Sequence, residues 1–530
     1  RSEIDNSRKG HAHLAFSKTE NLTSEGYFSY VKDFKGGHNL NATAGYSYFE
    51  VNGENFGMDN YNFSVDGIKY WDIGQGSYLT DGKAGMSSGK SVTERLFSFF
   101  ARANYSYQDK YMLSASIRHE GSSKFAADNR WANFWSATAG WRISNEEFMK
   151  DFDWLDDLKI RFGYGVTGNN DFSATYMANM LGSDTNWMMP NGTWAYSYGK
   201  SQNVNPNLGW EEKKEWNLGV DYSFFEGRLY GKFDYYRREV DNLLFSVKVP
   251  QPPYTQGSQM QNIGSMESKG WEFEVGGDII RTKDFTWSSS MNLSHNTGKI
   301  LTLEGDNSYH NGNGFVAPGT PGDAARMEAG STIGSFYMWK FAGFDDEGSF
   351  LLYNKDGEVI PAAQKTENDK QYIGNYTPKL IIGWSHTLTY KNFDLGINLR
   401  SWIDFDVYNT INMYYGIQGQ GNLNVLKDAY GKFNHIKGEK QICDYFLEDG
   451  TFLKIDAITL GYTLPMKMYT NNLIDRIRIY GTVGNVCTIT GYSGMNPEVD
   501  ITGWDKGTEK FWSDFYPVVR TWTLGMQFNF

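Results

Sequence analysis

The chain has 530 residues, and 35 Tyr, 35 Phe and 17 Trp give it an aromatic share of 16%. The formal net charge of -12 argues against the clustered Lys and Arg that a nucleic-acid partner needs, so we expect no nucleic acid among its ligands. The mean hydropathy is -0.55 and no run of about 18 apolar residues occurs, which excludes an ordinary transmembrane helix.

Apolar and polar residues alternate along almost the whole chain. In residues 215–224, for example, Trp216 and Leu218 alternate with Glu215 and Asn217, which is typical of a strand with one apolar and one polar face. We predict about 14 strands from this pattern. The candidate segments, two of them doubtful, begin near residues 10, 23, 37, 96, 111, 131, 156, 213, 228, 265, 284, 378, 392, 452, 475 and 519.

The connections between these segments alternate between short and long. The short ones are residues 108–110, 226–228, 281–284 and 390–392. The long ones are residues 51–93, 167–210, 242–262, 298–375, 403–450 and 489–517. Short turns on one side and long loops on the other are typical of an outer-membrane barrel, in which the turns are periplasmic and the loops extracellular.

A soluble β-sandwich is the alternative fold, and the composition of the two strand faces argues against it. A sandwich core is built from Val, Ile and Leu, whereas the apolar face here is rich in Trp, Tyr and Phe, as in an aromatic girdle. The other face carries many charged and amide side chains, which a dry core would have to pair at a cost of several kcal/mol each. We therefore predict an all-β chain that forms a transmembrane antiparallel β-barrel.

Two aromatic loops are the candidate ligand-binding sites. Residues 186–200 contain Trp187, Trp194, Tyr196 and Tyr198, and residues 412–422 add Tyr414 and Tyr415 beside several amides. Flat aromatic faces with Asn and Gln donors suit a sugar or a peptide. Packing of these rings against other loops, or against a partner that covers the barrel, is the alternative interpretation.

No catalytic constellation is found, and we predict neither an enzyme nor a cofactor. The sequence has no HExxH and no GxSxG, and the Gly-rich residues 310–319 lack the Lys of a phosphate loop. Acidic turns at 345–348 and 354–358 hint at calcium, but they do not have EF-hand spacing and solvated turns explain them better. Cys443 and Cys487 form either two free thiols or one disulfide.

Several stretches of the chain go beyond a generic barrel. One is "HEGSSKFAADNRWANFWSATAGWRISNEEFMK" (119–150), another "LKIRFGYGVTGNN" (158–170), and a third "DGTFLKIDAITLGYTLP" (449–465). These stretches resemble sequence blocks of the SusC/RagA family of TonB-dependent transporters. Further similar blocks, in the order in which the family has them, are residues 205–244, 262–277, 491–499 and 516–530. A departure is Cys487, where the family more often has an aromatic or aliphatic residue.

The resemblance implies a barrel of about 22 strands, of which this chain holds the last part. It also implies a signal peptide, an N-terminal extension, a plug and first barrel strands that we do not find in residues 1–530, so we expect this chain to be the C-terminal portion of a receptor. An incomplete barrel would leave two open edges in lipid. The missing N-terminal segment is therefore an expected partner of this portion.

The function that the resemblance implies is import across the bacterial outer membrane. Family members import oligosaccharides, or in some cases peptides, with a SusD-like surface lipoprotein as a lid. The TonB–ExbB–ExbD system supplies the energy through the plug, and the resemblance implies a dimer of transporter–lid pairs. A non-transport surface protein, such as an adhesin or a carbohydrate-binding module, and a passive porin are the alternatives.

The last strand, "TWTLGMQFNF" (521–530), is predicted to close the barrel. Its apolar face would lie against outer-membrane lipid, and its polar face would line the interior. A terminal strand that ends in Phe is also, as the resemblance implies, a signal for the barrel-assembly machinery. The residues of this predicted face are Trp522, Leu524, Met526, Phe528 and Phe530.

Overall fold

The computed structural model describes most of the chain. The described residues are 10–65, 67, 71–178, 181–303, 309–311, 322–419, 424–466, 473–500 and 518–530. Residues 1–9, almost all of the Gly-rich residues 310–319, and parts of the predicted loops 298–375, 403–450 and 489–517 lie outside this description.

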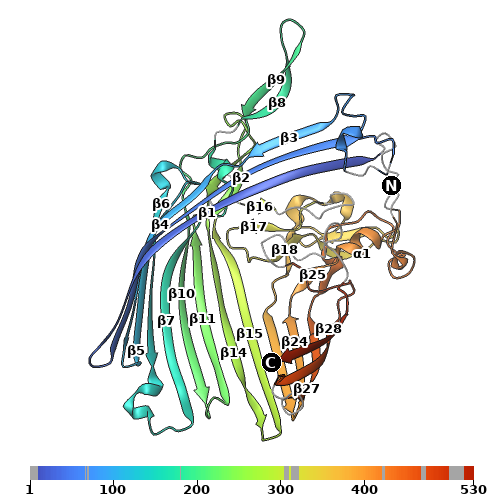
Figure 1. The fold of residues 1–530 in the computed structure, drawn as a ribbon. Helices are drawn as coiled ribbons and strands as arrows, with labels where there is room; N and C mark the ends of the chain where they lie inside the picture. Colours follow the sequence, from blue (N-terminus) through green and yellow to red (C-terminus); the bar gives the residue numbers. More distant parts are fainter. Residues whose placement is uncertain are drawn as a thin grey trace.

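One large antiparallel sheet forms a curved wall (Figure 1). It contains 16 strands, each paired with its neighbour along the chain, except that the short β3 (Gly85–Lys90) pairs with β2 beside the main path. The strands on the path are β1 (His11–Phe34), β2 (His38–Tyr61), β4 (Glu94–Tyr107), β5 (Tyr111–Ser122), β6 (Trp131–Arg142), β7 (Leu155–Asn169), β10 (Glu211–Phe224), β11 (Leu229–Asp241), β14 (Ser265–Arg281), β15 (Phe285–Thr302), β23 (Leu380–Tyr390), β24 (Phe393–Ile403), β27 (Phe452–Pro465), β28 (Arg476–Thr490) and β29 (Thr521–Asn529).

Small sheets occupy the long connections. They pair β8 (Leu181–Met188) with β9 (Trp194–Lys200), β12 (Leu244–Lys248) with β13 (Ser258–Asn262), β16 (Tyr309–Asn311) with β17 (Arg326–Glu328), β18 (Ser335–Met338) with β22 (Gln371–Asn375), and β25 (Asp406–Tyr408) with β26 (Leu447–Asp449). A three-stranded sheet joins β19 (Lys340–Phe344), β20 (Phe350–Tyr353) and β21 (Val359–Pro361).

Helices are few and short in the described part of the chain. The α-helix α1 covers Thr410–Tyr415. Short 3-10 helices cover Ile73–Gln75, Ala127–Asn129, Ile143–Asn145, Glu147–Met149, Ala174–Met177, Ala362–Gln364, Glu367–Asp369, Lys427–Tyr430 and Asp444–Phe446. None of the described helices has the length and apolar character needed to cross a membrane.

The predicted strands are found in the sheet, with two corrections. The end of β2 and all of β3 lie in residues 51–93, which were predicted to be a loop. The segments expected near residues 10 and 23 form a single strand, β1, of 24 residues, which pairs with β2 from Phe34 opposite His38 to His11 opposite Tyr61. The polar stretch around Lys18 reads as a break in the alternation. No Gly or Pro occurs between residues 14 and 25, however, so nothing in the sequence turns the backbone there.

Short and long connections lie at opposite ends of the wall, as predicted. At the turn end, Gln108 and Asp109 both have positive φ (51° and 52°), which is the geometry of a tight turn between β4 and β5. The turn between β10 and β11 has the same character at Phe225 and Glu226. At the other end, residues 170–210, 242–264, 303–379 and 404–451 connect the strands. By the rule for outer-membrane barrels, these long connections are extracellular.

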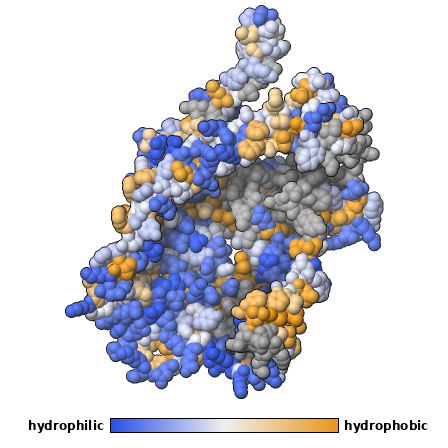
Figure 2. Space-filling model, viewed as in Figure 1, coloured by the Kyte–Doolittle hydropathy of each residue, from blue (hydrophilic) through white to orange (hydrophobic). Residues whose placement is uncertain are grey.

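The two faces of the wall differ in polarity. On β7, Arg161 lies on the inner face and contacts Asp221 of β10, whereas the next residue, Phe162, points outward and is 50% exposed. Figure 2 shows the hollow side of the wall lined largely by hydrophilic residues, with hydrophobic residues gathered over the region of β28 and β29. This alternation is the expected arrangement for a polar interior and a lipid-facing exterior.

The largest cluster of buried hydrophobic side chains lies among the long connections. We call residues 322–379, 404–419 and 424–451, which belong to the connections between β15 and β23 and between β24 and β27, the loop lobe. Its buried cluster is Ala324, Phe336, Met338, Trp339, Phe350, Leu352, Tyr376, Tyr408, Met413, Tyr414, Ile417, Phe433, Ile436, Ile442, Cys443 and Phe446. The lobe is therefore a folded unit that two separate connections build together.

Candidate functional site

The hairpin of β8 and β9 carries four of the predicted ligand-binding aromatics. Trp194, Tyr196 and Tyr198 alternate along β9 and share one face, and they are 64%, 73% and 69% exposed. Trp187 lies opposite Ala195 and is 67% exposed. In Figure 1 the hairpin stands clear of the wall at its loop end. It therefore presents an open aromatic face on the side of the long connections.

Local sequence explains why this hairpin forms. The residues between the two strands are Met189, Pro190, Asn191, Gly192 and Thr193. Gly192 has a φ of 81°, and its amide donates to the Met189 carbonyl at 2.8 Å. The Asn191 side chain accepts from the Thr193 amide at 3.1 Å. Pro, Asn and Gly are the residues that such turns favour, so the turn is encoded locally.

Tyr414 and Tyr415 do not form an exposed aromatic surface, which corrects the sequence-based expectation. Tyr414 lies on α1, is 1% exposed, and belongs to the buried cluster of the loop lobe; Tyr415 is half-buried against that cluster. The ammonium of Lys440 lies 4.9 Å from the centre of the Tyr414 ring. Burial raises the pKa of the Tyr414 hydroxyl. The alternative interpretation, loop packing, therefore describes Tyr414.

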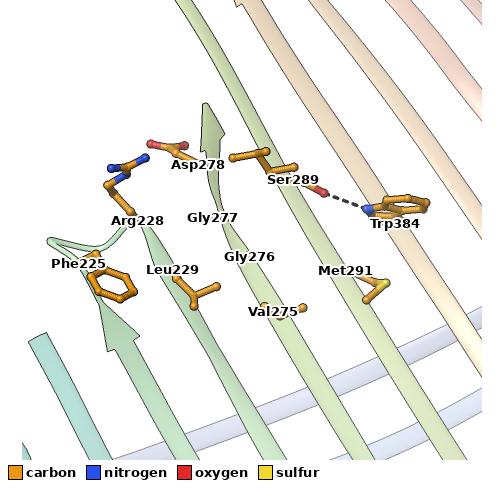
Figure 3. A pocket seen from close by; sticks show the side chains of 11 residues that line it. Phe225, Arg228, Leu229, Val275, Gly276, Gly277, Asp278, Ser289, Met291 and Trp384 are labelled. Carbon is orange, nitrogen blue, oxygen red and sulfur yellow. Dashed lines mark hydrogen bonds between the residues drawn. The ribbon is translucent and has the colours of Figure 1, made fainter. Parts of the chain in front are cut away.

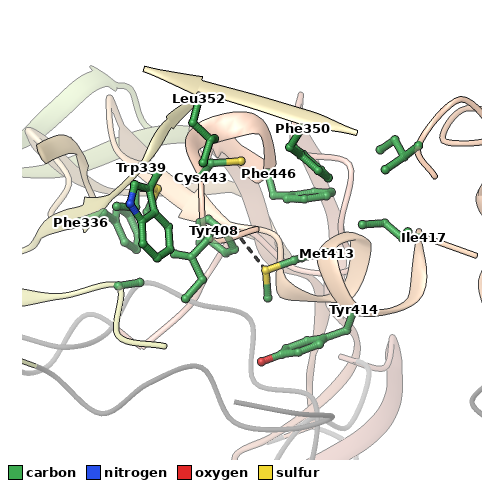
Figure 4. Close-up of a cluster of buried hydrophobic side chains, with 14 of the residues drawn as sticks. Phe336, Trp339, Phe350, Leu352, Tyr408, Met413, Tyr414, Ile417, Cys443 and Phe446 are labelled. Carbon is green, nitrogen blue, oxygen red and sulfur yellow. Dashed lines mark hydrogen bonds between the residues drawn. The ribbon is translucent and has the colours of Figure 1, made fainter. Parts of the chain in front are cut away.

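Aromatic packing joins the two connections of the loop lobe, and hydrogen bonds within and between the connections add to it (Figure 4). The Tyr408 hydroxyl donates to the Met413 sulfur at 3.3 Å inside the cluster. Asp444 of one connection accepts from the Phe341 amide of the other at 2.6 Å. The Trp339 indole donates to the Thr366 carbonyl at 2.8 Å. These contacts fix the shape of the extracellular end.

Ion pairs line the inner face of the wall. The guanidinium of Arg161 contacts both oxygens of Asp221 at 2.8 Å and lies 3.2 Å from Asp234. On the adjoining part of the wall, Lys232 of β11 lies 3.1 Å from Glu274 of β14. Charges in the interior are acceptable because they are paired and face a space that water can reach.

A second charged group lies where the inner face meets the loops. Arg400 of β24 contacts Asp456 of β27 at 3.0 Å and Glu498 at 2.6 Å, and Lys454 also reaches Glu498 at 3.2 Å. Glu498 follows β28, so this group ties two strands, β24 and β27, to the β28–β29 connection. These residues were not predicted from the sequence. Alternation places them on the polar face, but only the register shows which charges pair.

The acidic turns and the two cysteines were the sequence-based candidates for a metal site or a reactive thiol. The described part of the chain contains no group of three or more His, Cys, Asp and Glu arranged to hold a metal ion. Asp345 and Asn354, from the acidic turns, each accept backbone amides of their own turns. Cys443 and Cys487 are both free, and burial raises the pKa of the Cys443 thiol to about 12.

The face of β29 that was predicted to meet lipid is exposed. Trp522, Leu524, Met526, Phe528 and Phe530 are 75%, 83%, 56%, 46% and 86% exposed. β29 pairs with β28, and within the described residues neither β29 nor β1 has a partner on its other edge.

Comparison with known proteins supports the fold and its placement. The family model described as "TonB dependent receptor-like, beta-barrel" matches residues 4–486. TonB-dependent receptor P3 of Formosa agariphila is 30% identical over 98% of this chain and 53% of its own length. TonB-dependent receptor SusC of Bacteroides thetaiotaomicron is 32% identical over 85% of this chain and 45% of its own length. The chain thus spans about half the length of the curated relatives it matches.

Solved structures agree with this assignment. The RagAB peptide transporter superposes with a TM-score of 0.79 at 25% identity, covering 98% of this chain and 56% of its own. The outer membrane transporter YddB from Escherichia coli superposes with a TM-score of 0.51 at 11% identity, which shows the fold alone. The family consists of transporters and receptors rather than enzymes. The chain belongs to the TonB-dependent receptor-like β-barrel family and, within it, to the SusC/RagA group of outer-membrane proteins.

Proposed function

We propose that this chain forms part of an active importer of oligosaccharides. The observation that supports this most directly is the exposed row of Trp194, Tyr196 and Tyr198 on the extracellular side. Sugars bind to flat aromatic rings through their C–H faces and to nearby amides and charged groups through their hydroxyls. The charged inner face of the wall then offers hydrogen-bonding groups along a route through the barrel.

The proposed function also requires a lid, a plug and an energy source, none of which lies among the described residues. A SusD-like lipoprotein would cover the extracellular loops, and TonB, with ExbB and ExbD, would act through a plug. The free edges of β1 and β29 would pair with further strands of the same receptor, because unpaired edges are not stable in lipid. Transporter–lid pairs would form dimers. The chain would perform no covalent chemistry and would need no cofactor.

Peptide import is the second candidate function. It is supported by the likeness to RagAB, a peptide transporter, with a TM-score of 0.79. Aromatic side chains and amide donors also suit an extended peptide, so the exposed hairpin does not choose between the two ligands.

Growth of a deletion strain on a panel of glycans and peptides would test both candidates. We expect growth to fail on one class of glycan and to return with the wild-type gene. Failure only on peptides would support the second candidate, and undiminished growth on every nutrient would contradict import altogether. Purification of the intact receptor should also yield a lipoprotein lid.

The role of the hairpin can be separated from that of the barrel. In the complemented strain, a variant with Trp194→Ala, Tyr196→Ala and Tyr198→Ala should bind the nutrient more weakly. Tyr430→Ala is a matched control, because Tyr430 is an aromatic residue of the loop lobe that is 70% exposed. Equal uptake by the two variants would remove the hairpin from the proposed binding surface.

A further inference from the structure

The outer face of the wall has an apolar notch near the turn end of β11, β14, β15 and β23 (Figure 3). Its volume is about 540 Å³, within the range of small-molecule sites. The notch lies in the middle of the sheet path, far from the free edges of β1 and β29. Its lining residues are Phe225, Arg228, Leu229, Val275, Gly276, Gly277, Asp278, Ile279, Ser289, Met291 and Trp384.

Small residues at adjacent strand positions create this notch. Gly277 of β14 pairs with Leu229 on one side and with Ser289 on the other, so a missing and a short side chain lie together. A Cβ at Gly277 would meet the backbone carbonyl of Arg228, so close strand packing requires glycine here. Trp384 forms one side wall, and its indole donates to the Ser289 hydroxyl at 2.8 Å. The shape is therefore fixed by backbone and hydrogen bonding.

The positively charged side chain of Arg228 lies at the turn end of the notch. Arg228 is exposed, and its guanidinium makes no ion pair or hydrogen bond with any described residue. Asp278, beside it in Figure 3, is already engaged: it accepts from the Ser288 hydroxyl at 2.6 Å and lies 3.7 Å from Arg281. The notch thus combines an apolar floor with a guanidinium at its rim that forms no recorded ion pair with the described residues.

Neighbouring aromatics show at what depth in the membrane the notch lies. Phe225, Trp154 and Tyr390 surround the turn end of these strands and are 52%, 48% and 52% exposed. Exposed aromatic rings in such a row mark the boundary between lipid headgroups and acyl chains. Arg228 is therefore at headgroup level. The floor at Val275 lies about 10 Å further along the tilted strand, because three residues of a strand span that length, and it is therefore deeper in the membrane.

We propose that this notch binds one phospholipid of the periplasmic leaflet, with its phosphate on Arg228 and an acyl chain along Leu229, Val275 and Met291. Charge complementarity makes an anionic lipid, such as phosphatidylglycerol, the preferred occupant. A nutrient would find few hydrogen-bonding groups here, because the lining is mainly apolar. The proposal depends on the membrane location of the barrel and not on which nutrient is imported.

Native mass spectrometry of the intact receptor, titrated with phosphatidylglycerol or phosphatidylethanolamine, tests this proposal. Wild-type protein should retain one phosphatidylglycerol more tightly than phosphatidylethanolamine. Val275→Trp fills the floor and should abolish retention of both lipids. Its control is Leu113→Trp, which adds the same bulk on an outward residue of β5 that is 55% exposed.

The rim charge is tested separately. Arg228→Gln should weaken phosphatidylglycerol binding about fivefold, the effect of one basic residue at an anionic membrane surface. It should weaken phosphatidylethanolamine binding less, because the ammonium group of that lipid already offsets the phosphate charge. Lys35→Gln, in the exposed turn between β1 and β2, is the matched control and should bind as wild type.

Four results would overturn the proposal. Two of them concern the variants: equal lipid retention by Val275→Trp and Leu113→Trp, or equal phosphatidylglycerol affinity of Arg228→Gln and Lys35→Gln. The other two concern the occupant of the notch: bound detergent that added phospholipid does not displace, or a receptor dimer that dissociates when Val275 is replaced by Trp. All four variants change exposed or outward-facing side chains, and the heat-dependent gel shift of folded barrels would confirm that each one folds.

Discussion

The wall and the loop lobe are built from the same residue types but by opposite rules. In the wall, large apolar residues such as Phe28 (88% exposed) and Leu524 (83%) point away from the protein. In the lobe, Phe336 and Leu352 are 1% and 0% exposed and belong to the same buried cluster. The apolar side chains of the wall are thus placed to contact membrane lipid, whereas those of the lobe are buried against one another.

The difference teaches where stability resides in each region. Wall strands are held by continuous backbone ladders and by lipid around their outer face, so no single outward side chain is essential. The lobe faces water and has to bury apolar area to stay folded. The same truncation should therefore have unequal effects in the two regions.

The largest effect is expected from Phe336→Ala in the lobe. Removing a fully buried aromatic ring should cost about 3–5 kcal/mol of local stability. Cys443 is a built-in reporter, because its thiol is 0% exposed in the same cluster. In a Cys487→Ser background, thiol labelling should become at least about 100-fold faster.

The matching change in the wall is Phe28→Ala. Because Phe28 lies on the outer face of β1, this variant should leave Cys443 labelling at the wild-type rate. Similar acceleration in both variants would show that the lobe opens together with the wall, and the two regions would then be one cooperative unit.

A charge placed on either side of the wall gives the next largest effect. Leu460 of β27 points outward and is 54% exposed, and Thr459 beside it points inward, where its hydroxyl lies 2.9 Å from that of Thr482. Leu460→Arg should cost about 2–4 kcal/mol in a bilayer. Thr459→Arg should cost at most about 1 kcal/mol, mainly a lost hydrogen bond.

Unfolding of the intact receptor in phospholipid vesicles measures both values. If the two substitutions lower the free energy of unfolding equally, the assignment of inner and outer faces is wrong at this strand. If Thr459→Arg lowers it more, Thr459 faces lipid and Leu460 faces the interior.

The regular alternation made the wall predictable, and its absence hid the lobe. Every strand on the main path of the wall begins within a few residues of a predicted start, because lipid on one side and water on the other impose the same two-residue period on these strands. The lobe core joins Phe336 to Tyr408 and Phe446, residues far apart in sequence and without a shared period. Pattern alone therefore could not place Tyr414 inside it.

The hairpin of β8 and β9 could have been predicted in full. The alternating Trp194, Tyr196 and Tyr198 follow the turn residues Pro190 to Gly192, which is a recognised hairpin signal. The sequence could predict that the inner face carries charged residues, but not which of them form pairs. The partner of Arg161 depends on strand register, which sequence alone does not fix.

The ion pairs of the inner face should contribute modestly to the free energy of unfolding, less than the buried side chains of the lobe. The Arg161 and Asp221 side chains are 31% and 32% exposed, so water screens their attraction. A double-mutant cycle with Arg161→Met and Asp221→Asn should give a coupling energy of about 1 kcal/mol. A coupling of several kcal/mol would mean that the interior is drier than the structure indicates.

A smaller, pH-dependent effect is expected at Asp444 in the lobe. Burial raises the pKa of this carboxyl, which accepts from the Phe341 amide. The folded lobe therefore binds the proton more tightly than the unfolded lobe does. Its stability should fall as the pH rises from the unfolded pKa, near 3.9, through the raised folded value. Asp444→Asn should remove that part of the pH dependence.

Cys443 labelling with an aromatic disulfide reagent, normalised to the unfolded chain at each pH, would follow this change. Asp345→Asn, in an exposed turn of the same lobe, is the control. A lobe that becomes more stable with rising pH in wild type would contradict the sign of the prediction.

The smallest effect on stability is expected at the hairpin, and that is what distinguishes it from both other regions. Tyr196 is neither buried in the lobe nor part of the wall, so Tyr196→Ala should change the unfolding free energy by less than about 0.5 kcal/mol. Both the Cys443 labelling rate and unfolding in vesicles should match wild type. A strand pair that exposes four aromatic rings without supporting either structure is then free to serve binding alone. A measurable loss of stability would instead assign these rings to packing, and the proposed binding surface would lose its main support.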